Sequence, residues 1–299
     1  MDYALQQFLN AASFGAEYAL IALGLAIVFS LMGLVNFAHG EIIAIASYAA
    51  FFLILVGIDN PAVVALVAIA ASVLGAILFE RVAFRPVRHA PVATGLLTAF
   101  GVSIVVQNAF LLFVSPRPRP LPVFGGLNRT VELGGLKVQL LQLLEIGVTL
   151  AAISALLVFL RRSTLGLAMR AAARDFNTVR LMGLRANRVI ATAFAISGLL
   201  AGIAAVFIVA RRGSIEPDMG FMPVLKAFVA CVIGGFGSLG GAVLGGFVLG
   251  FVEVGILLVL PQSMGGLKDA VVFSLIALLL VARPQGILGS RVELGDKER

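Results

Sequence analysis

The sequence predicts an all-α polytopic membrane protein with about eight to ten transmembrane helices, organised as a single transmembrane domain over residues 1–299. Hydrophobic residues make up 61% of the chain and charged residues only 12%, whereas soluble proteins average about 45–50% and about 25%. The apolar residues also come in long continuous runs. Such runs are typical of spanning helices, because a membrane barrel alternates polar and apolar residues.

This composition excludes several classes of protein. A soluble enzyme, a nucleic-acid-binding protein and a disulfide-stapled secreted domain all need more polar surface or more cysteines than the chain has. The single cysteine, Cys231, lies in an apolar run, and the net charge of +7 is typical of orientation charge in loops. No basic residue precedes the first apolar run, so we expect that run to be kept as a span rather than cleaved.

Nine apolar runs follow one another along the chain, and several of the breaks between them carry a helix-breaking signal. Asn60-Pro61 is a turn and helix start, Pro91 and Pro223 suit helix N-termini, and Pro261 closes a run. The run 223–234 is short for a full crossing, so it is either re-entrant or continues through the glycine-rich stretch that follows. The runs are 14–35, 41–57, 61–79, 92–114, 140–160, 190–210, 223–234, 241–260 and 268–282.

The distribution of basic residues predicts the orientation. Fourteen of the 22 Lys and Arg residues fall in 80–91, 161–189 and the tail from 283, which lie on one side if nine runs cross. Basic loops face the cytoplasm. We therefore expect the 161–189 loop and a 284–299 tail in the cytoplasm and the N-terminus outside.

Segment 115–139 is the main external loop in this topology. Its prolines at 116, 118, 120 and 122 exclude a helix and indicate a stiff extended start. The segment is either a spacer or part of a docking surface for an external partner.

The sequence contains no recognisable motif of an ATP-binding, metal-binding or catalytic site. No G-x-x-x-x-G-K-[ST] is present to cradle ATP phosphates, and no His/Cys/Asp/Glu cluster has metal-ligand spacing. No Ser or Cys nucleophile has a recognisable base. Uphill movement by this chain would therefore take its energy from a partner or from an ion gradient, and a membrane-embedded enzyme is disfavoured.

The predicted cytoplasmic loop 161–189 contains a short amphipathic helix. One apolar stripe repeats at helical spacing, Ser163 or Thr164 can cap its start, and Gly183 can end it. The helix is either a surface helix on anionic lipid, a carrier of orientation charge, or a coupling helix docked on a cytoplasmic ATPase. Its candidate residues are Leu165, Met169, Arg170, Ala172, Arg174, Asp175, Phe176 and Gly183.

Polar residues interrupt or occupy several apolar runs. The segment 36–41 separates the first two runs without a proline, and is either buried in protein, lining a cavity, or an ordinary tight turn. Ionisable groups inside a membrane indicate function by default, although neutral hydrogen-bonded packing is the alternative. The candidate translocation residues are Asn36, His39, Glu41, Gln107, Asn108 and Glu253.

Glycine pairs predict close helix packing. Gly198 and Gly202 form one G-x-x-x-G, Gly241 and Gly245 a second, and Gly246 and Gly250 a third. The turn 234–240 shares this character, and its glycines Gly234, Gly235 and Gly237 permit unusual backbone conformations. No convincing internal repeat is visible in the sequence.

The chain resembles the permease subunits of high-affinity branched-chain amino acid ABC transporters, and is most similar to the shorter of the two permeases that such importers use. The motifs occur in the family's order over nearly the whole chain. They are 15–24, 36–41, 80–88, 169–175 with Gly183, 193–194, 226–228, 234–238 and 283–289.

The resemblance implies an ABC importer permease fold in the bacterial inner membrane. It implies a second related permease, two cytoplasmic ATPases that hold ATP and Mg, and a periplasmic binding protein that delivers Leu, Ile or Val. No cofactor is expected in this chain, and the amphipathic helix becomes the element that couples to the ATPases. The alternatives are urea, amides, other amino acids or small organic acids as substrates, or an ion-coupled secondary carrier, which would usually show inverted repeats.

Overall fold

We describe the fold from a computed structural model of the full chain. The ranges that the structure describes are 2–88, 90–133, 136–174, 186–235, 237–261, 266–282 and 286–287.

Helices account for most of the described chain, as predicted, and each of the nine apolar runs coincides with one helix. Six helices are long and apolar enough to cross a membrane: α1, α3 with the turn that follows it, α4, α5, α8 and α10. The helix α9 ends at Gly234, where Gly235 takes a φ of 100°, so it does not continue through the glycine-rich stretch. The helices are α1 (Asp2–Met32), α2 (His39–Leu55), α3 (Pro61–Phe79), α4 (Val92–Phe113), α5 (Leu140–Arg162), α6 (Thr164–Arg174), α8 (Ala186–Arg212), α9 (Phe221–Gly234), α10 (Leu239–Val259) and α11 (Lys268–Ala282), with a π-helical turn Glu80–Phe84 and a 3₁₀ segment Pro122–Asn128.

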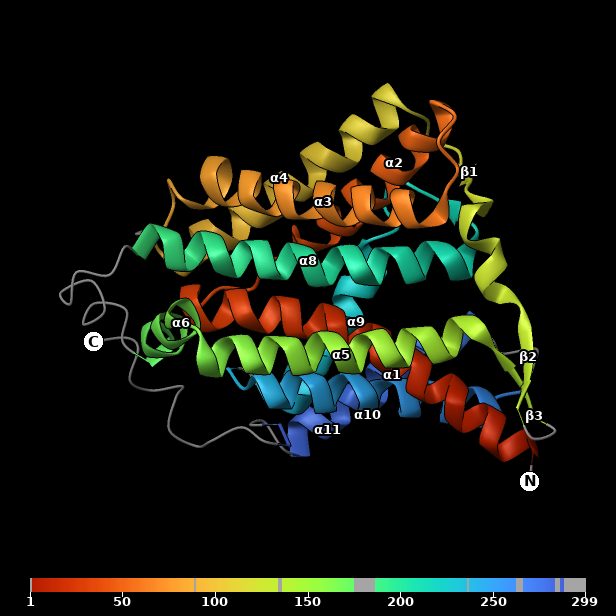
Figure 1. The fold of residues 1–299 in the computed structure, drawn as a ribbon. Coiled ribbons are helices and arrows are strands. Elements are labelled where there is room, and N and C mark those ends of the chain that lie inside the picture. Colours follow the sequence, from red (N-terminus) through yellow and green to blue (C-terminus); the bar gives the residue numbers. More distant parts are fainter. Residues whose placement is uncertain are drawn as a thin grey trace.

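Two short antiparallel strand pairs gather at one end of the bundle. The strand β1 (Arg119–Pro120) pairs with β4 (Ser214–Ile215), and β2 (Thr130–Leu133) pairs with β3 (Leu136–Gln139). In the proline-rich start of 115–139 only Arg119–Pro120 is strand, and a 3₁₀ helix begins at Pro122. The prediction that these prolines exclude a helix was therefore wrong from Pro122 on, because proline is tolerated at the first position of a helix. The N-terminus lies at this strand end, and α6 lies at the opposite end, which we call the α6 end (Figure 1).

The two halves of the chain share one architecture, which the sequence did not reveal. A long helix, a non-helical link, a short helix and a further long helix follow in the order α1–α2–α3 and again in the order α8–α9–α10. The first helix of each half packs antiparallel along the third helix of the other, α1 on α10 and α8 on α3. Any apolar residue can fill most of these positions, so the halves need little sequence similarity to fold alike. The structure thus shows a shared order of helices in the two halves, although no convincing repeat is visible in the sequence.

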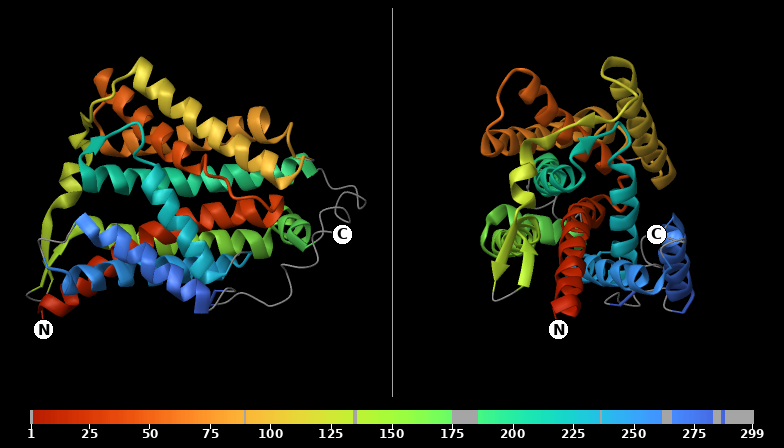
Figure 2. Two further views of the ribbon diagram at one scale, coloured as in Figure 1. Left: turned by 180° about the vertical axis from the view of Figure 1, so that it is seen from behind. Right: turned by 90° about the vertical axis from the view of Figure 1, so that its right-hand side faces the viewer.

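The short helices α2 and α9 begin against each other inside the bundle. A Cβ atom on Gly40 would lie 2.7 Å from the carbonyl oxygen of Gly220, and a Cβ atom on Gly220 would overlap the Gly40 carbonyl. From this meeting point α9 crosses obliquely from the layer of α2 and α8 to the layer of α10 (Figure 2). Only glycine lets two backbones approach so closely, so this contact sets the position of both helix starts.

Candidate functional site

The amphipathic helix α6 is attached rigidly to the end of α5. Ser163 caps its start, because the Ser163 hydroxyl accepts a hydrogen bond of 2.8 Å from the Gly166 amide. A Cβ atom on Gly166 would lie 2.6 Å from the Leu160 Cα, so the first turn of α6 sits directly on the backbone of α5. A force applied to α6 would therefore be transmitted to α5.

The buried face of α6 differs slightly from the predicted stripe. Met169 and Ala172 are buried as members of that stripe, but Leu165 is 40% exposed, and Gly166 and Ala168 are buried in its place. The start of α6 turns Gly166 toward α5, and this rotates Leu165 outward. The predicted residues Asp175, Phe176 and Gly183 lie outside the described residues.

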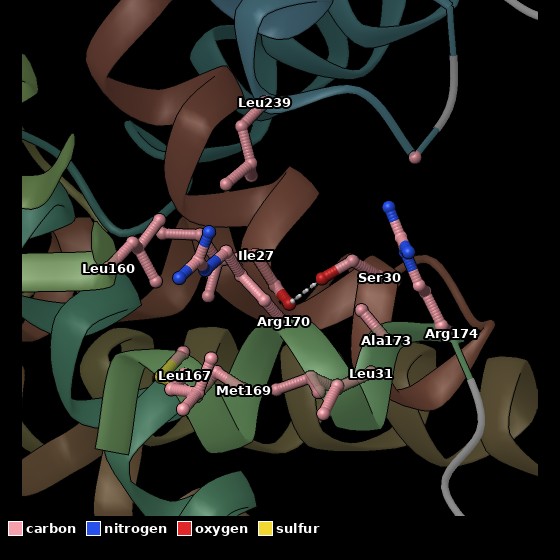
Figure 3. Close-up of a pocket in the computed structure, with 12 residues that line it drawn as sticks. Ile27, Ser30, Leu31, Leu160, Leu167, Met169, Arg170, Ala173, Arg174 and Leu239 are labelled. Carbon is pink, nitrogen blue, oxygen red and sulfur yellow. Dashed lines mark hydrogen bonds between the residues drawn. The ribbon is translucent and has the colours of Figure 1, made fainter. Parts of the chain in front are cut away.

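A cavity of about 700 Å³ opens beside α6. Its walls come from the end of α1, the end of α5, α6 and the residues that precede α10. In the close-up view the Arg170 and Arg174 side chains frame Ser30, whose hydroxyl donates to the Ile27 carbonyl (Figure 3). Both arginines are exposed, so the α6 end presents positive charge next to a largely apolar hollow.

The segment 36–41 is buried in protein rather than forming an exposed turn. Asn36, His39 and Glu41 are 2%, 0% and 2% exposed. His39 Nδ1 lies 3.1 Å from the Ser197 hydroxyl on α8, and the Glu41 carboxylate accepts hydrogen bonds from Ser103 and Gln107 on α4, at 2.7 and 2.8 Å. The structure thus brings the predicted residues Glu41 and Gln107 together.

Asn108 does not join this group. Its side chain donates to the carbonyl of Ile104 on its own helix, at 2.8 Å, in an exposed position. Asn36 is close in sequence to Glu41, but neither its amide nitrogen nor its amide oxygen has a hydrogen-bond partner among the described residues.

The predicted residue Glu253 lies in a separate ion network near the strand end. Its carboxylate accepts from Tyr18 on α1 at 2.5 Å, and pairs with Lys226 on α9 at 2.8 Å and Lys268 on α11 at 2.6 Å. Lys226 also lies 3.0 Å from Asp269. These contacts tie four helices together through charge.

A second ion network adjoins the first. The guanidinium of Arg211, on α8, pairs with the fully buried Glu145 of α5 and lies 3.6 Å from Glu17 of α1. The guanidinium also lies over the face of the Phe14 ring, with its carbon 4.1 Å from the ring centroid, and donates a hydrogen bond to the Ser13 hydroxyl. Both networks line one cavity of about 160 Å³, which we call the charged cavity.

Sequence reasoning missed most of the charged cavity, although a signal was present. Glu17, Glu145 and Lys226 lie inside the apolar runs 14–35, 140–160 and 223–234. The rule that selected Glu253, a charge within a span, selects these three residues equally.

The predicted glycine pairs lie at helix crossings. Gly198 and Gly202 on α8 face Ser72 and neighbouring backbone of α3, Gly241 and Gly245 face α9, and Gly246 and Gly250 face α1. The glycines Gly235 and Gly237 in the turn before α10 have φ angles of 100° and 89°, which favour glycine. Gly234 lies directly against Gly241, so a side chain on either would meet backbone.

A bundle of apolar helices with charged groups and cavities in its interior is the architecture of a polytopic membrane protein. Residues 7–282 match the family described as "Branched-chain amino acid transport system / permease component". The chain belongs to this family of transport permease components.

Two relatives illustrate the similarity. The chain is 39% identical over 300 residues to the high-affinity branched-chain amino acid transport system permease protein BraD of Pseudomonas aeruginosa, covering 95% of each chain. It is 38% identical over 302 residues to the high-affinity branched-chain amino acid transport system permease protein LivH of Escherichia coli (strain K12), covering 96% of each.

Proposed function

We propose that this chain is one of two permease subunits of an ATP-driven importer that moves Leu, Ile or Val across the bacterial inner membrane. The observation that carries the proposal is the exposed basic face of α6, which is attached rigidly to α5 beside the end of α1. Full-length similarity to permeases named for branched-chain amino acid transport supports the substrate class.

In this proposal the energy comes from other subunits. The sequence has no phosphate-loop motif, so ATP and Mg belong to two ATPase subunits that bind the α6 end from the cytoplasm. A periplasmic binding protein delivers the amino acid to the strand end, and a related permease completes the pathway. The excess of basic residues in 80–91 and 161–189 supports this orientation.

The contacts of α6 suggest how movement reaches the pathway. The first turn of α6 sits on α5 through Gly166, and α6 also contacts α1 and α8. Because α1 lies along α10 at glycine contacts, a shift of α6 acts on both halves of the bundle. Closure of the ATPase pair would then switch the bundle between two packings, which is alternating access.

Charge reversal on α6 tests the coupling role. We expect R170E/R174E to reduce leucine uptake by reconstituted transporter at least tenfold, while the subunits still co-purify and the ATPases still hydrolyse ATP. The control is R170K/R174K, which keeps the positive charge at the same two exposed positions and should import leucine as the native chain does. Unchanged uptake by R170E/R174E would refute coupling through α6, and uptake driven by an ion gradient without ATP would refute the proposed energy source.

A further inference from the structure

The charged cavity holds two charged groups whose partners are incomplete. In its lining, Lys226 and Lys268 each pair with Glu253, at 2.8 and 2.6 Å. Arg211, which also lines the cavity, bonds to Glu145. Glu17 accepts no hydrogen bond from the described residues, and its nearest cation is Arg211, at 3.6 Å. Arg212 makes no side-chain hydrogen bond or ion pair within the described part of the chain.

Burial makes the incomplete pairing of Glu17 informative, whereas Arg212 is exposed. Glu17 is only 7% exposed, and its ion pair with Arg211, at 3.6 Å, is too long for a hydrogen bond, so the buried carboxylate is only partly compensated. A carboxylate kept in this state is best stabilised by an incoming cation. Arg212 lines the same space and offers a guanidinium to an incoming anion.

One small molecule supplies both charges at once. The head group of a free amino acid carries an ammonium and a carboxylate on the same carbon, so it matches a partly compensated carboxylate and an exposed guanidinium that line one cavity. The remaining lining is apolar, through Phe14, Ile208 and Met222, which suits an aliphatic side chain. The volume of about 160 Å³ lies below the roughly 300–1,000 Å³ of typical ligand pockets, and therefore fits the head group with part of a short side chain.

We propose that the charged cavity is a transient binding site for a zwitterionic aliphatic amino acid. In this site the Glu17 carboxylate accepts hydrogen bonds from the α-ammonium, and the Arg212 guanidinium donates hydrogen bonds to the α-carboxylate. This inference rests on the proposed function and adds a substrate site within this chain. Binding should be weak, because a transport pathway must release its substrate.

The test uses the purified complex of this chain with its permease and ATPase partners, without binding protein. We expect millimolar L-leucine to raise the thermal midpoint of the complex. The single-charge analogues 4-methylpentanoate and 3-methylbutylamine should leave the midpoint unchanged, because each lacks one of the two charges. Equal stabilisation by leucine and by either analogue would overturn the proposal without any variant.

Three variants locate the effect. We expect E17Q and R212Q to weaken leucine binding about ten- to hundredfold, which is the value of a hydrogen bond to a charged group. The control D59N removes an exposed carboxylate from the turn between α2 and α3, and should bind leucine as the native chain does. Native binding by both E17Q and R212Q would overturn the assignment.

Uptake assays separate the two proposals. If the native complex with its binding protein imports leucine and E17Q imports it equally well, the charged cavity is not a substrate site but the proposed function stands. If the native complex imports no Leu, Ile or Val, the proposed function fails, and the inference that rests on it fails with it.

Discussion

The helices α1 and α4 have nearly equal mean hydropathy but opposite surroundings. In α1, 83% of the most apolar window is buried in the bundle, whereas in α4 only 11% is buried. Hydropathy therefore identifies both as spans and does not distinguish a central helix from a peripheral one.

The residues that make the difference are small or charged. The helix α1 presents Gly15 and Ala19 to α10, and Ser13, Glu17 and Tyr18 to the ion networks. The helix α4 buries only Gly95, Ala99 and Ser103, and its Phe113 is 86% exposed. Central position in this bundle thus follows from close backbone contact and buried charge, and not from apolar character.

The largest loss of stability should come from a bulky side chain placed where α1 crosses α10. A Cβ atom on Gly250 would lie 2.5 Å from the Gly15 Cα, so we expect G250L to destabilise the protein by about 3 kcal/mol or more. Thermal unfolding in detergent measures the change. The matched control is G255L, on the same helix, where no atom lies within 4 Å of an added Cβ. Similar stability of the two variants would show that close contact does not fix α1.

The next largest effect should come from the ion network around α1. The variant R211M leaves Glu145 buried without its cation, and we expect a loss of about 3–5 kcal/mol. The double variant R211M/E145L removes both charges of this pair and should recover part of that loss, because the buried Glu17 still lacks its nearest cation. A double variant no more stable than R211M would contradict the pairing as the source of the effect. Chemical denaturation of the three proteins supplies the comparison.

The smallest effect should come from the outer face of α4. Leu112 is 80% exposed, so L112A should change the stability of the chain by less than about 0.5 kcal/mol. A thermal melt of the purified chain checks this value. A loss above about 2 kcal/mol would mean that this face is covered within the folded chain, and the contrast between α4 and α1 would not hold.

Much of the fold could be predicted because helix ends in this sequence carry clear local signals. Asn60 caps α3, accepting from the Ala62 amide at 3.0 Å, and Pro91 precedes α4. Such signals act within a few residues, so the order and extent of the helices follow from local sequence.

The relations between helices could not be predicted in the same way. The meeting of Gly40 with Gly220, and of Glu253 with Tyr18, joins residues far apart in the chain. Periodicity within one helix carries no information on which other helix it touches. Glu17 and Lys226 were detectable as charges within spans, but their convergence on one cavity depends on the oblique path of α9.

The shortness of α2 and α9 has a consequence for biosynthesis. They have 17 and 14 residues, which at a rise of 1.5 Å per residue gives about 26 and 21 Å, less than the roughly 30 Å of a bilayer core. Neither helix alone is a strong insertion signal for the translocon. We therefore expect each to enter the bilayer together with the longer helix that follows it, so that both halves of the protein are inserted as hairpins during translation.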